Sequence, residues 1–519
     1  MVPAGAPWPT GHMTSARPSV RELAAHTPHD RNRAVDAYRA AAMAVVAVGH
    51  WLGMVAVMGS DGSIVAGNLL DHAPEYGWFT WIGQVMPLFF FVGGFASATS
   101  LRSAERDGVA PADWIATRLH RLAAPARTLA VCWAVALAVG AALGRFEVVA
   151  MGAIGAAIPL WFLANYTIDL ALAPFTFRWF RARPVLFVAA LVAAFAVGEA
   201  ARFHEVPLLP WINWVVGWLG FQVAGFAWQD RRLPTGRALA ALAAAFWTLA
   251  LAAVHVGPWP AVMLHHGGLE HSPTHPPSTA LILFGLAYSF TAASAAPAVT
   301  RWLERSGRAW RATVAANGLA MSVYLWHMTA AVIVAGSAYA LGLLSHDVPG
   351  TSGWWWTKVP FLLADLCVLA PIVARVAPVE RRALLGGRRR WRGGTASLLG
   401  AAALLSVAVK AWSSPHIGVL VAGVVATIGI TAVLRWAGAD GVGHSHGEEP
   451  ARHRSRAAPH PRPSVLGRGR HPLAAQHPCT AVPALGAVPA VERTDQLADR
   501  HGRHPGVVRP RPDDAAEDG

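Results

Sequence analysis

The sequence has few charged residues and almost no cysteine. Charged side chains make up 14% of its 519 residues, whereas soluble domains carry about 25%, and hydrophobic residues make up 54%. The three cysteines, Cys132, Cys367 and Cys479, show neither a CxxC pair nor metal-ligand spacing. This composition excludes a cysteine-based redox or metal motif and indicates a polytopic membrane protein.

Apolar segments long enough to cross a bilayer, about 20 residues each, recur along the chain. We count twelve, give or take one, at 37–58, 77–100, 122–144, 148–174, 184–200, 209–228, 237–256, 277–299, 314–342, 354–376, 395–413 and 416–436. The sequence therefore predicts an all-α integral-membrane bundle, with about ten core helices and about two more near the C-terminus.

Arginines cluster in alternate connections between these segments. The clusters lie at 102–121, 178–183, 231–232, 301–311 and 381–390, whereas the connection 257–276 holds none. By the positive-inside rule, both termini and the Arg-rich connections are predicted to be cytoplasmic. The first 35 residues show no cleavable signal peptide, so the first helix is interpreted as a signal anchor of a multi-pass protein in the plasma or inner cell membrane.

Four parts of the chain differ in composition. Residues 1–35 are predicted to be a cytoplasmic N-terminal segment, 36–376 the membrane core, and 377–437 two additional transmembrane helices. Residues 438–519 are rich in Arg, His and Pro and have almost no aromatic residue, which predicts a disordered cytoplasmic tail. The net charge of +14 lies largely in the cytoplasmic parts. We therefore expect the lipid bilayer and anionic cytosolic ligands as partners, and no nucleic acid.

Histidines gather in two places outside the predicted helices. The connection 257–276 contains His265, His266, His271 and His275, and the tail contains His444 and His446. Neither group has firm metal-ligand spacing, so no metal is expected. The loop is more naturally interpreted as lining the entrance for a substrate.

An arginine and a histidine stand inside the first apolar segment. Arg39 and His50 are eleven residues apart, close to three helical turns, so they share one face at a separation of about 16 Å. Asp36 continues the stripe toward the helix start. Ionisable groups at membrane depth are costly, and they usually face a bundle interior or an aqueous cavity where they bind or react. The stripe predicts a functional site.

Five segments together resemble a known family. They are DAYRAAAMAVVAVGH, MPLFFFVGGFASATSLRS, RLHRLAAPA, PLWFLANYTIDLALAP and NGLAMSVYLWHM. In this order, from about residue 31 to 376, they resemble the acyltransferase 3 family of integral-membrane acyltransferases. The resemblance implies transfer of an acyl group, often acetyl, from cytosolic acyl-CoA to a hydroxyl of an envelope glycan, a lipid-linked saccharide or a small molecule. It leaves the acyl group, the acceptor and the oligomeric state open.

The resemblance also implies catalytic residues. The family's arginine and histidine, separated by ten residues, fall on Arg39 and His50. Imidazole suits a general base that takes the proton of an attacking hydroxyl, and Arg39 is predicted to bind the donor or hold developing negative charge. Asp36 is predicted to belong to the same group of catalytic residues. His327, in SVYLWHM, is predicted to position substrate or share proton handling with His50. A purely structural role in the bundle is the alternative for each.

Binding residues follow from the same pattern. Arg118 and Arg121, with Arg102 as a weaker candidate, are predicted to bind the phosphates of CoA, although any cytoplasmic loop carries arginines. Predicted substrate-binding residues are Tyr324, Trp161, Asn165 and Asp169, the last three recurring every four residues. No serine or cysteine nucleophile stands at a recognisable spacing from a base, so direct transfer is favoured over an acyl-enzyme.

A transporter or flippase is the main alternative function, because intramembrane His and Asp also serve proton relays. Transporters often show two matching halves, and no convincing repeat relates 37–228 to 237–436. A non-catalytic scaffold is the third interpretation.

Overall fold

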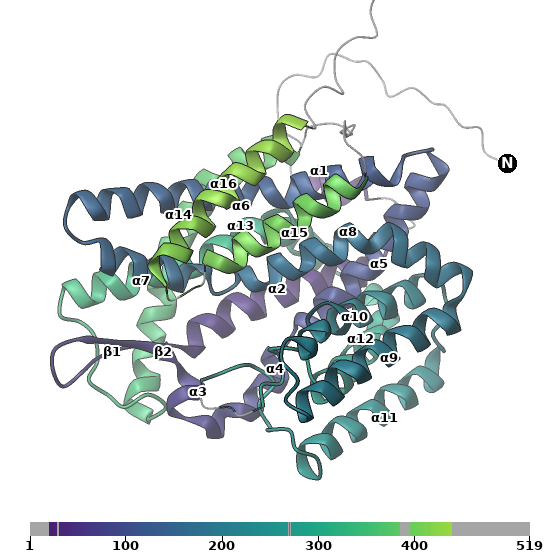
Figure 1. Cartoon of the computed structure of the whole chain (residues 1–519), viewed down its shortest axis with the longest axis horizontal. Helices are drawn as coiled ribbons and strands as arrows, with labels where there is room; N and C mark the ends of the chain where they lie inside the picture. The colour runs from purple at the N-terminus through teal and green to yellow at the C-terminus, as the bar shows by residue number, and fades with distance from the viewer. Residues whose placement is uncertain are drawn as a thin grey trace, which may run out of the picture. The chain divides into compact units, whose positions relative to one another are not determined.

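The computed structural model describes residues 20–27, 31–267, 269, 271–384, 395–412, 414 and 416–437. The predictions for the tail 438–519, with His444 and His446, and for most of the Arg-rich connection 381–390 lie outside these residues. Within them the chain is almost entirely helical (Figure 1), which confirms the predicted all-α fold.

The described chain forms sixteen α-helices and two 3₁₀ turns. In order, the helices are α1 Val20–Ala25, α2 Arg33–Gly53, α3 Leu69–His72, α4 Thr80–Gly83, α5 Met86–Arg106, α6 Pro111–Ala142, α7 Phe146–Ala157, α8 Leu160–Ala182, α9 Pro184–Phe203, α10 Ile212–Gln229, α11 Gly236–His255, α12 Thr279–Arg305, α13 Gly307–Ala340, α14 Ser352–Leu384, α15 Thr395–Trp412 and α16 Ile417–Ala437. The 3₁₀ turns are η1 Pro74–Phe79 and η2 Leu209–Trp211.

Among the described residues, nine helices are long and apolar enough to cross a membrane, or ten if α7 and α8, bent by 46°, form one span. The chain is a multi-pass membrane protein. The other two predicted segments correspond to α2 and α10, of 21 and 18 residues. Helix α2 contains the ionisable residues Arg33, Asp36 and Arg39 near its start, which lower its mean hydropathy.

The first predicted segment, 37–58, is not helical throughout. Helix α2 ends at Gly53, and Met54–Met58 forms strand β1, which pairs antiparallel with β2, Ile64–Asn68. The sequence MVAVM alternates, so Val55 and Val57 are buried while their neighbours are more exposed. These valines pack against Trp354, and that buried face stabilises a strand where a helix was expected.

Helices α2 and α13 run parallel and side by side. Arg39 contacts Asn317 near one end, and His50 contacts His327 farther along both helices. Helix α2 also packs against α5, α12 and α14. Figure 1 shows α15 and α16 lying over α6 and α8, with which they pack. Segments far apart in the sequence thus meet along α2.

Helices α5 and α10 approach so closely that both need glycine at the contact. A Cβ atom on Gly94 would lie 2.1 Å from the Gln222 carbonyl oxygen, and one on Gly225 would lie 2.0 Å from the Phe91 carbonyl oxygen. Small residues permit this kind of close packing between membrane helices.

Replacing Gly94 with alanine is therefore expected to destabilise the folded chain. The added methyl group overlaps backbone atoms, which cannot rotate away, and overpacking of this kind costs about 1–3 kcal/mol or more. Thermal unfolding of the detergent-purified protein measures the effect. Gly336→Ala is the matched control because nothing lies within 4 Å of its added Cβ; equal unfolding temperatures for the two variants would contradict the contact.

Candidate active site

Two histidines from distant parts of the chain form a pair in the core of the bundle. His50 Nδ1 on α2 lies 3.0 Å from His327 Nε2 on α13, and the two rings stack with centroids 5.1 Å apart. His327 is fully buried, whereas His50 is partly exposed. The indole of Trp51 donates to the His327 carbonyl oxygen at 3.0 Å and thereby fixes the two helices beside the pair.

The hydrogen bonds define where the protons lie. His327 Nδ1 is 2.7 Å from the Tyr324 carbonyl oxygen, which can only accept, so Nδ1 carries a proton. In the neutral ring, His327 Nε2 then accepts from His50 Nδ1–H. His50 Nε2 is left with a free lone pair on the more exposed ring. The arrangement therefore presents one imidazole nitrogen as a base, with the second histidine holding it in orientation.

Arg39 belongs to a polar cluster near the start of α2. Its Nε donates to Asn317 Oδ1 at 2.8 Å, and Asn317 donates to the Asp36 carbonyl oxygen at 2.8 Å. The Asp36 carboxylate contacts Arg31 at 2.5 Å and Arg39 at 3.8 Å. Asp36 is buried and lies in this cluster, about four turns from His50. It therefore holds the arginines in place and does not contact the histidine pair.

Arg118 is held rigidly on α6. It donates to the Ser100 hydroxyl, and its guanidinium lies 4.8 Å from the ring centroid of Trp114, in cation–π geometry. Arg121 is exposed one turn further along and close enough to Arg118 for mutual repulsion. Two adjacent arginines with unused donors favour an anion. Arg102, by contrast, is paired with Asp230 at 2.5 Å, so it joins the ends of α5 and α10.

The comparison with protein families agrees with this arrangement. A family model described as an acyltransferase domain, that of acyltransferase 3, matches residues 32–374. The chain belongs to the acyltransferase 3 family. It is a membrane acyltransferase, and this assignment favours acyl transfer over the transporter and scaffold alternatives. No curated protein and no solved structure gave a significant match.

The sequence analysis did not single out Tyr166, which lies near two of the predicted site residues of this acyltransferase. Its side chain, on α8, interacts electrostatically with both Arg39 and Arg118. Gly93 leaves room for it, because a Cβ there would come 3.2 Å from the Tyr166 ring. Tyr166 follows Asn165 directly and so lies about 100° away from the four-residue stripe on which the prediction rested. Tyr166 therefore lies close enough to the arginines of α2 and α6 to interact with their charges.

The predicted substrate-binding stripe on α8 divides into two environments. Asn165 and Asp169 are fully buried, and within the described structure their side-chain polar atoms have no hydrogen-bond partner. Trp161 instead packs with Trp218 at 5.4 Å and His275 at 6.1 Å between ring centroids. The acyltransferase thus keeps two unpaired polar groups inside α8 and an aromatic cluster near the loop 257–276.

Tyr324 has a structural contact. Its hydroxyl donates to the Pro159 carbonyl oxygen, at the break between α7 and α8, and the side chain is buried. Tyr324 also supplies the carbonyl oxygen that accepts from His327. Both contacts hold Tyr324 in place beside the histidine pair, and its predicted role in substrate binding stays a prediction.

The loop histidines have different polar partners, although the rings of His265 and His275 contact each other with centroids 4.9 Å apart. His265 contacts Ser272 at 3.1 Å, and His266 lies 3.6 Å from Asp71. Burial lowers the pKa of His275 to about 3, with Lys410 and His265 adding to the effect, so this ring is neutral at physiological pH. In the part of the chain that the structure describes, no group of three or more His, Cys, Asp or Glu residues could hold a metal ion.

Proposed function

We propose that this acyltransferase transfers an acyl group, in the first place acetyl, from cytosolic acyl-CoA to a hydroxyl of an envelope glycan, lipid-linked saccharide or small molecule. The supporting observation is the His50–His327 pair, which presents a base of fixed tautomer on a partly exposed ring. We place the enzyme in the plasma or inner cell membrane, with both termini and Arg118 on the cytoplasmic side, because of the arginine distribution.

In the proposed reaction, His50 Nε2 takes the proton of the acceptor hydroxyl as its oxygen attacks the thioester carbonyl carbon. The C–O bond forms, the C–S bond breaks, and the CoA thiolate leaves with that proton as a thiol. The positive charge that His50 carries in between is shared with His327 through the Nδ1–Nε2 hydrogen bond. No covalent acyl-enzyme is required.

The donor would extend along α2 from the arginines to the histidines. Arg39, Arg118 and Tyr166 form the polar end of this route, and Arg39 lies about 16 Å from His50 along the helix. That is a span which the extended pantetheine arm of CoA can bridge. The phosphates would then contact guanidinium groups, which bind phosphate in bidentate fashion, while the thioester reaches His50.

The function is tested with the purified full chain in lipid vesicles, supplied with acetyl-CoA carrying a labelled acetyl group and an envelope extract. We expect free CoA thiol and a base-labile labelled ester to form in equal amounts. Thiol release without ester would mean hydrolysis, and movement of an acceptor across the vesicle without thiol release would mean transport. Either result would overturn the proposal.

His327 is expected to act as a positioning residue. His327→Ala removes the acceptor of His50 Nδ1–H and should lower kcat by roughly 10- to 100-fold with little change in the KM for acyl-CoA. His327→Gln restores an acceptor oxygen and should recover part of kcat. Equal losses in both variants, with equal losses of folded protein, would assign His327 a packing role only.

A further inference from the structure

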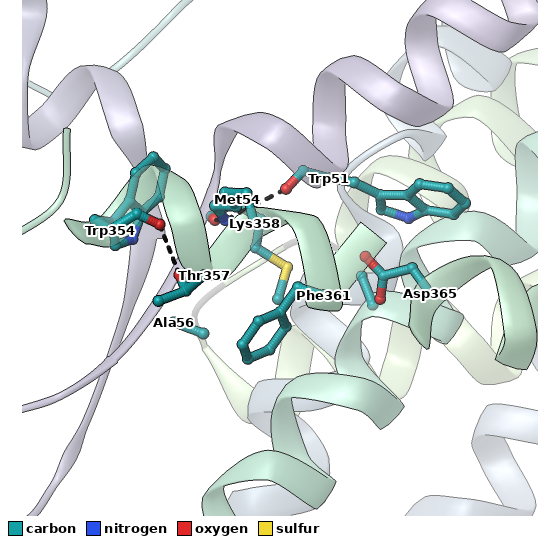
Figure 2. Close-up of a pocket in the computed structure, with 9 residues that line it drawn as sticks. Trp51, Met54, Ala56, Trp354, Thr357, Lys358, Phe361 and Asp365 are labelled. Atoms are coloured by element: carbon teal, nitrogen blue, oxygen red, sulfur yellow. Dashed lines mark hydrogen bonds between the residues drawn. The ribbon is translucent and has the colours of Figure 1, made fainter. Parts of the chain in front are cut away.

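A small cavity lies at the end of α2 that carries His50, away from Arg39. It is lined by Trp51, which follows His50, by Ala331, one turn beyond His327, and by Lys358 and Asp365 of α14 (Figure 2). Strand β1 closes it through Ala56. Its volume of about 20 Å³ admits one water-sized polar group. Neither histidine lines the cavity, but Trp51 does, and its indole donates to the His327 carbonyl oxygen.

Lys358 contributes a hydrogen-bond donor to this cavity. Its side chain is 8% exposed, and its ammonium donates to the carbonyl oxygens of Trp51, at 3.4 Å, and of Met54. These carbonyls belong to the end of α2, where helical acceptors lack partners within the helix. An ammonium group has three N–H donors, so the carbonyls leave one unused, and the ammonium also lies 4.3 Å from the centroid of the Trp354 ring in cation–π geometry. Lys358 and Lys410 are the only lysines in the sequence.

Asp365 contributes an acceptor. It lies seven residues after Lys358, on the same face of α14, and is 4% exposed. Its Oδ1 atom has no hydrogen-bond partner within the described residues, and its carboxyl group interacts electrostatically with Lys358. A buried carboxylate oxygen without a partner is costly. The cavity therefore offers one N–H donor that the backbone carbonyls do not use and one acceptor oxygen without a partner.

A hydroxyl group matches this pair, because it donates one hydrogen bond and accepts others. We propose that the cavity is the acceptor-side subsite, and that Lys358 and Asp365 bind a second, non-reacting hydroxyl of a polyol acceptor while His50 receives the proton of the reacting one. This rests on the proposed function. It makes the acceptor a compound with at least two hydroxyls, such as a sugar or glycerol derivative, rather than a simple alcohol.

The test uses matched alcohols with the full chain in vesicles and labelled acetyl-CoA. The probes are 1-hexanol and the 1,2-, 1,4- and 1,6-hexanediols, and the measured quantity is kcat/KM for each diol divided by that for 1-hexanol. For the wild type we expect at least one diol to exceed 1-hexanol tenfold or more, as expected for a hydrogen bond to a charged group. Asp365→Ala and Lys358→Met should bring that ratio toward one.

Two further variants separate binding from folding. Asp365→Asn preserves the side-chain shape and should lower the ratio less than Asp365→Ala, while Asp347→Ala removes an exposed carboxylate before α14 and should keep the wild-type ratio. A wild-type ratio near one, or an unchanged ratio in Asp365→Ala, would overturn the subsite. Formation of esters from envelope extract, but from none of the alcohol probes, would also overturn the subsite. If no ester forms from extract either, the proposed function fails and the subsite with it.

Discussion

Replacing His50 with alanine is expected to lower acyl transfer by roughly 10²- to 10⁴-fold, the usual contribution of a general base. The variant leaves His327 Nε2 facing the vacated space, but that nitrogen is on a fully buried ring, one ring further from the acceptor. The loss should fall on kcat, because in the proposed mechanism His50 contacts the reacting hydroxyl and not the phosphates of the donor. Initial rates of labelled ester formation at saturating acetyl-CoA measure it.

The control for this variant is His346→Ala, which removes an exposed imidazole in the connection before α14 and should retain wild-type activity. Both variants need equal amounts of folded protein in the membrane. Ester formation by His50→Ala within a few-fold of the wild-type rate would remove His50 from the chemistry, and the proposed mechanism would then lose its base.

The fold could be predicted from the sequence because it depends on local patterns. Runs of about 20 apolar residues locate the helices, and each of the twelve predicted segments coincides with helix over most of its length. The prediction that the first helix extends to residue 58 was wrong. Met54–Met58 is as apolar as the helix before it, and its strand pairing is stabilised by packing against Trp354. Trp354 lies about 300 residues away in the sequence, so no local sequence pattern could predict this contact.

Helical spacing predicted the stripe of Asp36, Arg39 and His50, but the family pattern was needed to relate it to other helices. His50 and His327 are 277 residues apart, and the resemblance alone related them. Pairings between distant residues could not be predicted from the sequence, and the salt bridge between Arg102 and Asp230 is an example. The predicted phosphate-binding role of Arg102 stays a prediction. Arg31 lies before the start of α2, so helical spacing does not relate it to Asp36. Their salt bridge could therefore not be predicted from the periodicity of the sequence.

Arg118 and Arg102 illustrate why exposure and partners decide a binding role. Both are arginines near the Arg-rich ends of helices. Arg102 forms a salt bridge with Asp230, which also lies 3.7 Å from Arg232, whereas Arg118 contacts a neutral hydroxyl and an aromatic ring. The charge of Arg118 is therefore still available to an anion, and its orientation is fixed before the ligand arrives. Preorganisation of this kind increases affinity because less side-chain freedom is lost on binding.

Arg118→Met is accordingly expected to raise the KM for acetyl-CoA by roughly 10- to 100-fold, as expected when a charge-assisted hydrogen bond to phosphate is lost. Acetyl-pantetheine, a donor without the phosphates and the nucleoside, separates binding of the phosphates from general damage. Wild type and Arg118→Met should use it with similar kcat/KM, because neither can gain from a phosphate contact. Arg301→Met removes an exposed charge on α12 and should leave the KM for acetyl-CoA at the wild-type value. If Arg118→Met lost activity equally with both donors, Arg118 would support the structure of α6 and the phosphates of CoA would bind elsewhere.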